Sequence, residues 1–546
     1  MKVTYRHANP WSGNESFLLR FDDGITSRTP CLLVDAGRDV DVDDLLGADD
    51  YLAAILLTHA HLDHYVSLGS ALRDGAPILA AADTAAILGP VLAEGEHHYD
   101  IRNADDVARA VEPLDGWRRV VDDIRVHPVA AGHAPGAAGF LVEFSDDDPR
   151  RILATGDFTD RRAAGYPGFD ADGIDVDAVF LTGATAADVE ETLGEVVETA
   201  IGRARAGSTT LCTASGLSGI HLAYLFGHVS KRVDGPGVDL VGHAAKLYDR
   251  LGYDVPNVTA TGTFAAPSDV LSAGNVTIAG PEVPVEGSSG RLFGTIRSDA
   301  GATLLQVTGG GTDPVTDAGC TVYDYTVSNH PSEATVDGVV EALDPVEIVI
   351  THQPGRTSNR FKDRYDSALV WATDDDDAYV IYDGGWQAPP WVGERTERAV
   401  LGDHFGPRFE TEVSGPVPER HDVDLAAEGL PIEELTRRLA PPAGDVDRRA
   451  DPAGSDPGAG DGPPGGGDSA ARRDDATPTA DGPSLDVVLA RLDEIGAAVT
   501  TPRVRVRVIR SDEGLTLLRV LDGDVALEDG AELEVVPVDG GETDDD

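Results

Sequence analysis

The sequence predicts a mixed α/β (α+β) fold in which a strand-rich region is interrupted by a segment of regular α/β alternation. Three observations lead to this prediction. Short apolar runs separated by Gly and Asp come first, helix-like segments alternating with buried strand-like runs occupy the middle, and strand-like runs then return. A chain of 546 residues is long enough for two or three domains with linkers.

The composition is strongly acidic. The formal net charge is −53, and the basic residues are almost all arginine, since the lysines are Lys2, Lys231, Lys246 and Lys362. Such a chain suits concentrated salt, where screening shortens self-repulsion to about 3 Å at roughly 1 M. The 41% of hydrophobic residues argues against a wholly disordered acidic chain. We therefore expect a folded protein adapted to high salt.

The cysteines and the hydropathy pattern bear on the compartment. Cys31, Cys212 and Cys320 lie far apart within apolar runs, so we expect buried free thiols and a reducing environment. The first residues lack the apolar core of a signal peptide, and no run approaches the roughly 18 apolar residues of a membrane span. These features predict a cytoplasmic protein that does not cross a membrane.

The first 400 residues are predicted to form an interrupted domain. Residues 1–185 contain the strand-like runs CLLVDAG, AAILLTHAH, IRVHPVAAGH and RILATGDF. Residues 186–320 alternate helices with buried strands, as in TTLCTAS followed by IHLAYLFGHVSKRV, and are expected to form a separate α/β layer. Residues 321–400 return to strand-like runs and close the first domain, and residues 401–440 form an extension.

Two further segments follow the extension. Residues 441–483 are Gly, Pro, Asp and Ala with few large apolar side chains, so they cannot bury enough surface to offset chain entropy and are predicted to be a disordered linker. Residues 484–540 combine a helical pattern with the alternating runs RVRVRVIR and LTLLRVLD. This helix-plus-strand module is too small for independent stability unless it docks or oligomerises, so a homodimer is compatible with it.

The stretch ILLTHAHLDH joins an apolar strand to four residues of metal-ligand type. His59 and His61 can point the same way as the strand ends, because side chains alternate along a strand, and Asp63 and His64 follow on the next turn. A single histidine here would be more typical of a structural residue. Four ligand-type residues within six positions favour a metal site.

Three other strand-like runs end in residues of the same kind. Asp157 ends RILATGD, His352 ends VEIVITH, and His133 precedes a Gly-rich turn. Taken alone, Asp157 could cap a helix and His352 could be a core histidine. If these strands end at one edge, their side chains converge on one site. Seven candidates exceed one tetrahedral ion, so we infer two divalent ions about 3.5 to 4 Å apart, bridged by an aspartate and a water-derived hydroxide.

These motifs, HAHLDH, GHAPG, TGDF and the later THQ, resemble the ordered motifs of the metallo-β-lactamase superfamily. The resemblance implies a four-layer αββα sandwich that binds two zinc ions, with manganese as an alternative. It implies that Asp157 bridges the ions and that Asp35 in LLVDAG supports the histidine loop. The implied ligands are His59, His61 and His133 for one ion, and Asp63, His64 and His352 for the other.

The segment between Asp157 and His352 indicates which subgroup of the superfamily the chain resembles. Its α/β pattern is similar to the inserted domain of the β-CASP nucleases, the subgroup that includes RNase J and the cleavage and polyadenylation endonuclease. TVSNHPSEATVDGVVEALDPVEIVITHQ resembles the closing segment of that subgroup. The resemblance implies that His330 contacts the scissile phosphate and helps to protonate the leaving oxygen. The alternative is that His330 only precedes a helix. The similarity covers roughly residues 1–385.

Two departures from the subgroup pattern concern His330. The family places an acid in an EST or DST signature after the TGDF strand, whereas this chain has Thr182, Gly183, Ala184 and Thr185. The acid that orients the β-CASP histidine is therefore missing, which predicts slower turnover unless another carboxylate substitutes. SNHP also replaces SGHA, which changes the backbone freedom before His330.

Basic residues follow two of the predicted ligands. Four cations cluster after His352, and Arg161 and Arg162 follow Asp157. We expect the first cluster to position phosphates; the alternative is that surface arginines pair with neighbouring acids. The cluster consists of Arg356, Arg360, Lys362 and Arg364. Because counterion release is weak in high salt, shape, metal contacts and base stacking must supply more of the affinity.

The sequence therefore predicts a zinc-dependent phosphodiesterase that hydrolyses RNA in preference to DNA, with Asp63, Asp157 and His330 as catalytic residues. No obvious RNA-binding module precedes the first domain, which favours an exonuclease over a processing endonuclease. Two alternatives remain. One is a small-molecule hydrolase of the same fold, such as a thioesterase or lactonase, and the other is a weakly active RNA-binding subunit.

Overall fold

The computed structural model describes residues 1–99, 101–121, 123–353, 355–403, 415–440, 506–510 and 516–520, without the side chains of 355, 356, 403 and the last two ranges. The chain divides into two compact units, Met1–Arg448 and Arg449–Asp546. The mixed α/β class predicted from the sequence is confirmed, with several sheets and helices in the first unit. The predicted linker 441–483 lies outside the described residues.

One seven-stranded sheet is built from the N-terminal region and one late strand. Its first strand alternates buried and half-buried residues, as the period of two predicts. Strands β3 to β6 run parallel and the others pair antiparallel. In spatial order the strands are β20 (Tyr379–Asp383), β1 (Lys2–His7), β2 (Phe17–Asp22), β3 (Thr29–Val34), β4 (Asp50–Leu57), β5 (Ile78–Ala81) and β6 (Val111–Leu114).

A second seven-stranded sheet packs against the first. Side chains of both sheets, including Phe17 and Phe180 with ring centroids 4.3 Å apart, form one shared core. Four of its strands run parallel to one another. In spatial order they are β19 (Leu369–Trp371), β18 (Glu347–Thr351), β11 (Ala178–Thr182), β10 (Asp148–Ala154), β9 (Ala138–Asp146), β8 (Ile124–Ala130) and β7 (Arg118–Val121).

Helices connect and cover these strands. Helix α4 packs on β5 and β6 and contacts α5. Helix α10 begins after its N-cap residue Ser332, whose hydroxyl accepts a hydrogen bond from the amide of Thr335. The helix therefore follows directly from the segment that carries His330. The helices of this region are α1 (Val42–Leu45), α2 (Leu62–Tyr65), α3 (Leu68–Ala71), α4 (Ala82–Gly95), α5 (Ala104–Ala110), α10 (Glu333–Leu343), η2 (Gly355–Phe361) and α11 (Glu394–Asp403).

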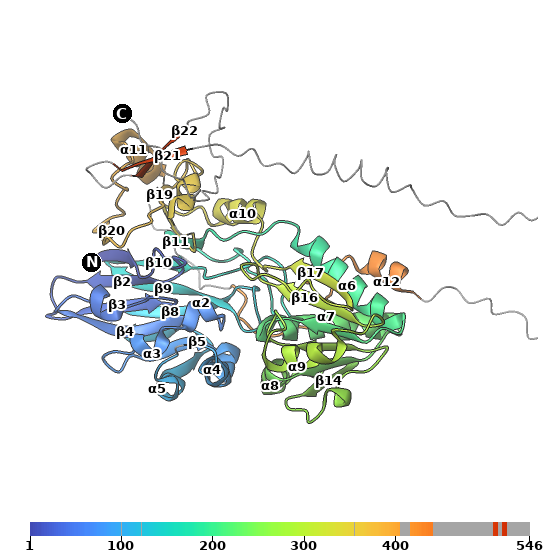
Figure 1. Ribbon diagram of the computed structural model, residues 1–546. Coiled ribbons are helices and arrows are strands. Elements are labelled where there is room, and N and C mark those ends of the chain that lie inside the picture. Colours follow the sequence, from blue (N-terminus) through green and yellow to red (C-terminus); the bar gives the residue numbers. More distant parts are fainter. Residues whose placement is uncertain are drawn as a thin grey trace, which may run out of the picture. The chain divides into compact units, whose positions relative to one another are not determined.

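A third, six-stranded sheet lies in the middle of the chain and is wholly parallel. Figure 1 shows it with its helices beside the two larger sheets. In spatial order its strands are β14 (Val258–Thr261), β13 (Val238–Val241), β15 (Val276–Ala279), β12 (Thr210–Thr213), β16 (Thr303–Thr308) and β17 (Thr321–Thr326). The associated helices are α6 (Val189–Arg205), α7 (Gly216–Val233), α8 (His243–Arg250), η1 (Pro267–Asp269) and α9 (Gly287–Ile296).

The inserted sheet extends further along the chain than predicted. The boundary was expected at residue 320, but β17 pairs with β16 along its whole length, so the insertion reaches Thr326. The reason is that CTVYDYTV forms an edge strand of the inserted sheet. Its alternating residues read equally well as a strand of the first domain.

Residues 415–440 pack on the middle of the chain, where α12 (Ile432–Leu439) contacts α6 and α7. The carboxylate of Glu428 is fully buried and accepts hydrogen bonds from the amides of Ala164 and Gly165 at 2.8 and 2.7 Å. It also lies 2.9 Å from Nε2 of His221 on α7. The extension thus joins the inserted sheet to the loop after β10.

The second unit contains one described hairpin. Its strands β21 (Val506–Arg510) and β22 (Thr516–Val520) pair antiparallel, in agreement with the two alternating runs predicted there. The rest of the predicted module 484–540 lies outside the described residues.

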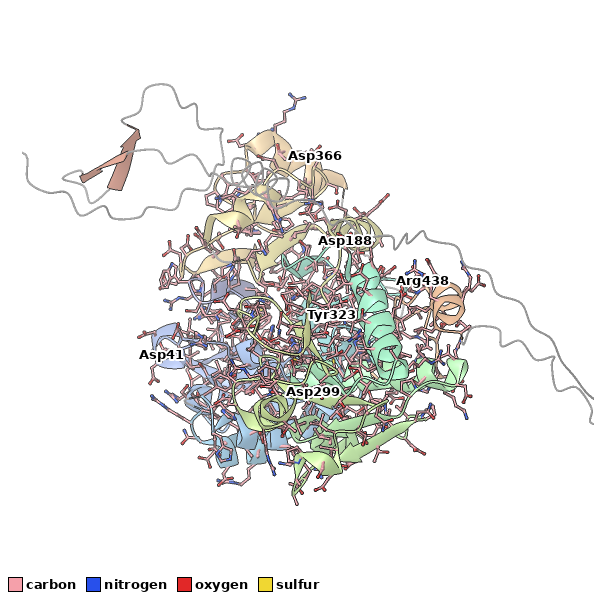
Figure 2. All side chains as sticks on the ribbon, turned by 45° about the vertical axis from the view of Figure 1, so that its right-hand side comes forward. Asp41, Asp188, Asp299, Tyr323, Asp366 and Arg438 are labelled. Carbon is pink, nitrogen blue, oxygen red and sulfur yellow. The ribbon has the colours of Figure 1, made fainter. Side chains whose placement is uncertain are left out.

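The surface of the first unit carries much of the acidic excess. Four exposed aspartates are labelled in Figure 2: Asp41, Asp188, Asp299 and Asp366. The three cysteines are free and buried, as predicted. Within the described ranges, none of the helices has the length and apolar character needed to cross a membrane.

Candidate metal centre

The predicted ligands lie just after strand ends, on loops except for Asp63 and His64, which lie in the short helix α2. The segments after β3 and β4 in one sheet, and after β8, β10 and β18 in the other, meet at one edge. Together they carry eight residues that we call the histidine–aspartate centre. These are Asp35, His59, His61, Asp63, His64, His133, Asp157 and His352.

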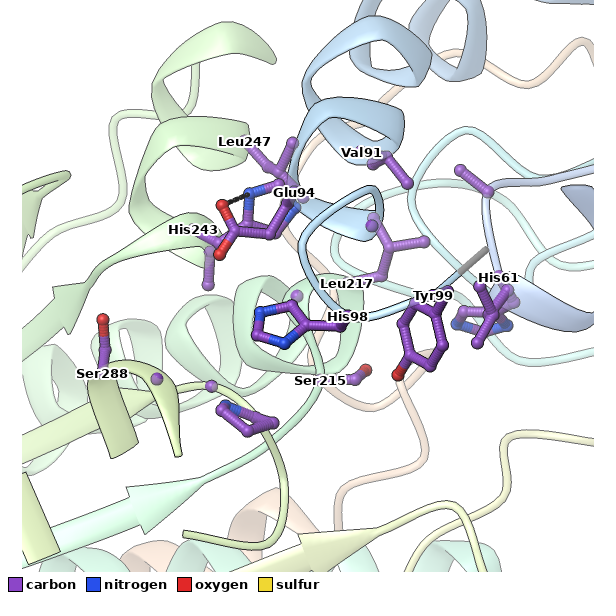
Figure 3. A pocket seen from close by; sticks show the side chains of 18 of the residues that line it. His61, Val91, Glu94, His98, Tyr99, Ser215, Leu217, His243, Leu247 and Ser288 are labelled. Carbon is purple, nitrogen blue, oxygen red and sulfur yellow. Dashed lines mark ion pairs between the residues drawn. The ribbon is translucent and has the colours of Figure 1, made fainter. Parts of the chain in front are cut away.

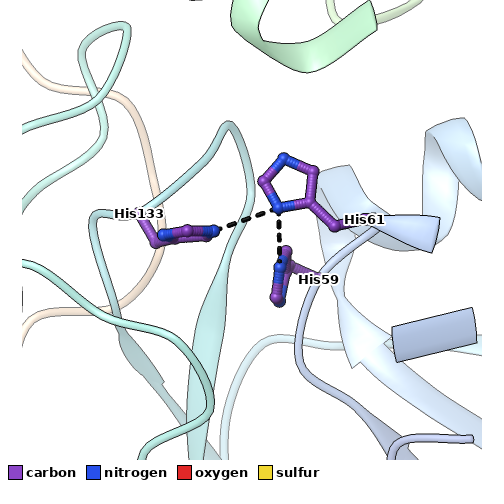
Figure 4. Close-up of side chains that lie close together, drawn as sticks. All are labelled: His59, His61 and His133. Carbon is purple, nitrogen blue, oxygen red and sulfur yellow. Dashed lines mark hydrogen bonds between the residues drawn. The ribbon is translucent and has the colours of Figure 1, made fainter. Parts of the chain in front are cut away.

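Three histidines form the first group of this centre (Figure 4). Nδ1 of His61 lies 2.9 Å from Nε2 of His59 and 3.0 Å from Nε2 of His133. The carbonyl oxygen of Asn329 accepts from Nδ1 of His133 at 2.9 Å, so that nitrogen carries the proton and Nε2 presents a lone pair to the group. Three ring nitrogens that converge in this way suit one divalent cation.

Asp63, His64 and His352 form the second group. Nδ1 of His64 donates to Asp35 at 2.8 Å, because a carboxylate only accepts, so in the neutral imidazole Nε2 of His64 carries the lone pair. That Nε2 is buried without a hydrogen-bond partner. It lies 3.8 Å from a carboxylate oxygen of Asp63, as does Nε2 of His352. An orphaned, buried lone pair beside a carboxylate fits a cation at this position.

Asp157 lies between the two groups. One of its carboxylate oxygens accepts from Nδ1 of His352 at 2.7 Å and from the hydroxyl of Thr182 at 3.1 Å. The other lies 3.3 Å from Nε2 of His64 and 3.9 Å from Nε2 of His133. A single carboxylate therefore faces both groups, which is the position that a bridging ligand needs.

Asp35 supports the histidine loop without joining either group. Its carboxylate accepts from the amide of Thr58 at 2.8 Å and from the Thr58 hydroxyl, in addition to His64. It is 1% exposed. These bonds hold the backbone just before His59 and orient the ring of His64.

Burial and neighbouring charges shift the pKa values of the histidines of the centre in different directions. Burial lowers the pKa of His59 and of His133 well below the usual range, and it lowers the pKa of His61 to about 4. Burial also acts to lower the pKa of His64 and of His352, but the carboxylates of Asp35 and Asp157 outweigh this effect. They raise the pKa of His64, and Asp157 raises the pKa of His352 to about 8. The first group thus consists of neutral imidazoles, the form that binds metal.

Asp157 stays ionised despite its burial. Burial raises the pKa of this carboxyl, but His352, His330 and His64 together lower it well below the usual range. Asp63 behaves in the same way, with His64 and His61 outweighing the effect of burial on its pKa. Both carboxylates are therefore available as anionic ligands.

The sequence pattern did not single out Glu15, a buried acid near the centre. Glu15 is 4% exposed, and burial raises the pKa of its carboxyl to about 7. It accepts from the Asn9 side chain, and one carboxylate oxygen has no partner. A Cβ at Gly37 would lie 1.7 Å from Glu15 Oε1 and 2.1 Å from the carbonyl of Asp63, so Gly37 permits this close packing. The signal available in the sequence was an acid directly before the apolar strand β2.

The same N-terminal loop braces His352. The amide of His352 donates to the carbonyl of Asn14 at 2.6 Å, and the Asn14 side chain reaches the carbonyl of Gln353 at 3.4 Å. His352 has a φ of 52°, a left-handed conformation that is uncommon outside glycine. The hydrogen bonds from Asn14 help to hold this ligand in it.

His330 lies at the rim of the centre and lines the cleft. Its Nδ1 is 3.9 Å from Asp157 and has no hydrogen-bond partner, and its ring centroid is 4.9 Å from that of His133. Arg161 holds the segment by donating to the His330 carbonyl and to the Asn329 side chain, both at 3.1 Å. Burial lowers the pKa of His330.

In the region of the missing acid, the side chain of Gln353 lies close to Gly183. A Cβ at Gly183 would lie 2.2 Å from Cγ of Gln353, so the Gln353 side chain fills that space. Thr182 in the same segment donates to Asp157 instead. Among the described residues, the carboxylates that act on the pKa of His330 are Asp157 and Asp63, which belong to the centre.

The cations after His352 are engaged with neighbouring acids and a ring. Arg360 pairs with Glu333 at 3.0 Å and donates to the Gly183 carbonyl, while Arg364 donates twice to Asp337 at 2.8 Å. Lys362 lies 4.8 Å from the centroid of the Trp391 ring. The side chain of Arg356 lies outside the described part. The alternative of arginines paired with acids is thus observed, and phosphate binding by this basic segment stays a prediction.

A cleft of about 640 Å³ opens over the centre. His61, Asp63, His133, Asp157 and His330 line it from one side, and the inserted sheet contributes its other wall through α7 and the loops after β15 and β16. A smaller cavity of about 230 Å³ adjoins it between α4 and the N-termini of α7, α8 and α9 (Figure 3). A substrate in the cleft would contact both the centre and the insertion.

Comparisons with known proteins give a likeness of fold. No family model matches the chain, and no curated protein matches it. Among solved structures, a protein of unknown function from Enterococcus faecalis V583 is similar with a TM-score of 0.50 at 14% identity. The similarity covers 70% of this chain and 100% of that one. This likeness concerns the arrangement of the chain alone.

Proposed function

We propose that this protein is a zinc-dependent phosphodiesterase of the metallo-β-lactamase superfamily, β-CASP subgroup, and that it hydrolyses RNA. The observation that carries the proposal is the orphaned Nε2 of His64, buried 3.3 Å from Asp157 and next to three converging imidazoles. The paired seven-stranded sheets and the inserted parallel sheet support an αββα sandwich with a β-CASP-like insertion.

The residues at hand fit two divalent ions. His59, His61 and His133 would hold one, Asp63, His64 and His352 the other, and Asp157 faces both groups. Such ions supply a nucleophile at neutral pH by lowering the pKa of water, and they neutralise a phosphate. Manganese is an alternative to zinc at the same ligands.

The chain itself contributes orientation and a proton. His352 and Thr182 fix Asp157 by donating to one of its oxygens. His330 is 14% exposed at the wall of the cleft, with an unpartnered Nδ1 that can hold a proton for the leaving oxygen. Arg161 acts as a positioning residue for the His330 segment by donating to the main-chain carbonyl of His330.

The first experiment compares wild type with Asp157→Ala on labelled RNA in concentrated KCl with zinc. Loss of Asp157 removes the carboxylate that faces both ligand groups, so cleavage is expected to fall to the level of a blank without enzyme. Asp172→Ala is the matched control, because Asp172 is an exposed acid of the same domain. Circular dichroism verifies the fold. Unchanged cleavage by Asp157→Ala contradicts the proposal.

The same preparation separates the alternatives. Turnover of thioesters or lactones without RNA cleavage identifies a small-molecule hydrolase. About two zinc ions per chain without turnover of any of these substrates identifies a binding subunit. Comparing the cleavage of RNA with a 5′-monophosphate and RNA with a 5′-hydroxyl distinguishes exonuclease from endonuclease action. Comparing RNA with DNA of the same sequence reports the sugar preference.

A further inference from the structure

Two large exposed apolar side chains line the cleft, and a third is next in sequence to a lining residue. Tyr99 and Val285 line it from opposite walls and are 48% and 75% exposed. Trp11 is 72% exposed and adjoins Ser12, another lining residue. Of the six large apolar side chains that are exposed in the described part of the chain, these are three. Exposed apolar groups concentrated at a cleft mark a binding surface.

Tyr99 presents a ring that the fold itself leaves uncovered. Its amide donates to the carbonyl of Gly95 at 2.8 Å, which anchors the loop after α4. Figure 3 shows its ring beside His61 at the edge of the smaller cavity, and both residues line the two cavities. An aromatic ring that is half exposed at a cleft can stack on a nucleobase.

The charges of the cleft disfavour recognition through phosphates. Asp63 and Asp157 are proposed metal ligands; away from the centre, the acids that line the cleft are Glu282 and Glu286, and Arg38 is the one lysine or arginine among its described lining residues. Arg38 is exposed, and no ion pair to it is recorded in the described ranges. A row of phosphates would meet more carboxylates than cations here. Affinity must therefore come from the metal centre and from contacts that do not depend on charge.

We infer that the cleft holds single-stranded RNA by its bases, with Tyr99 and Trp11 as stacking surfaces and Arg38 as a lone phosphate contact. This inference rests on the proposed function, since it takes the substrate to be RNA. Unpaired bases are required, because a duplex buries the faces on which these rings stack. Binding through rings also tolerates concentrated salt, which suppresses binding through cations.

The test measures anisotropy of a short, labelled, phosphorothioate-linked RNA with full-length protein in zinc and KCl. Tyr99→Leu and Trp11→Leu, which keep apolar bulk but remove the ring, are each expected to weaken binding about tenfold. Tyr99→Phe, which keeps the ring, is expected to stay within about twofold of wild type. Ile25→Ala is the control, since Ile25 is 88% exposed and does not line the cleft.

Salt dependence and strandedness give two further readouts. With one phosphate contact, the slope of log affinity against log KCl is expected near −0.7 for a single strand. The annealed duplex should bind at least about tenfold more weakly. Equal binding by the Leu variants, a slope near −3 (about four contacts), or preferred duplex binding overturns the inference.

Hydrolysis of bis(p-nitrophenyl) phosphate separates this inference from the proposed function. This small diester has no RNA chain, so its hydrolysis by the wild-type protein tests the phosphodiesterase proposal apart from the stacking surfaces. If the diester is not hydrolysed, the phosphodiesterase proposal fails, whereas the anisotropy still reports on the stacking surfaces.

Discussion

The basic segment directly follows His352, the last residue of the histidine–aspartate centre, yet the polar side chains of the two regions differ in whether they have partners. In the centre, Nε2 of His64 is buried and finds no partner among the described residues. In the basic segment, Arg364 donates twice to Asp337 and also pairs with Glu333. The chain thus leaves a buried nitrogen of the centre without a hydrogen-bond partner, whereas it provides carboxylate partners for the arginine of the basic segment.

The comparison teaches which clusters of polar residues point to a ligand. One proton on Nδ1 of His61 can serve only one of the two lone pairs that face it, on His59 and His133, and burying the other unpaired costs free energy, so an external cation is the better partner. Arginines in an acidic chain find carboxylates at little cost. Through Glu333 and Asp337, the basic segment fastens α10 to the stretch after β18, which is a structural role.

The largest expected effect is that of zinc on stability. With free zinc about 100-fold above each dissociation constant, each ion adds about 2.7 kcal/mol to the free energy of unfolding, or about 5 kcal/mol for two independent sites. Urea denaturation in concentrated KCl, with zinc or with a chelator, measures this difference. His133→Ala should lose about half of it, whereas Arg364→Ala should keep it all. Identical denaturation curves with zinc and with chelator would contradict zinc binding by the histidine–aspartate centre.

A smaller effect is expected from Asp35→Asn. Asp35 has a φ of 57°, which asparagine tolerates, so the substitution tests the charge of this support for His64 and not the backbone. Loss of such a supporting carboxylate weakens metal binding by roughly 10–100-fold. Zinc titration against a competing chelator should show one ion bound as in wild type and the other weakened. Equal weakening of both ions, or of neither, contradicts the assignment of His64 to a separate group.

The convergence of the ligands was predictable because it depends on local pattern. His59, Asp157 and His352 each follow an apolar run, and strands that end at one edge bring such residues together. The spacing within HAHLDH needs no knowledge of distant contacts. For the same reason the alternating runs that form β21 and β22 were recognised as strands.

Features that depend on distant contacts could not be predicted. The pairing of Arg364 requires the position of α10, and the burial of Glu15 requires the close approach that Gly37 permits. The end of the insertion was misplaced because an alternating edge strand, β17, reads the same in either sheet. Tyr99 lacked any local signal, since its exposure at the cleft depends on where α4 ends relative to the inserted sheet.

The smallest expected effect is that of Arg364→Ala. The side chain is 22% exposed and its partners Glu333 and Asp337 are more exposed, so the lost ion pairs are worth about 0.2–1 kcal/mol and less in concentrated salt. Cleavage of RNA should stay within about twofold of wild type, because the guanidinium is held by acids and does not line the described cleft. Arg398→Ala, which removes an exposed pair with Glu394, is the control. A tenfold or greater loss of RNA cleavage with unchanged hydrolysis of bis(p-nitrophenyl) phosphate would mean that Arg364 leaves its acids for a phosphate, and the two regions would then serve one substrate.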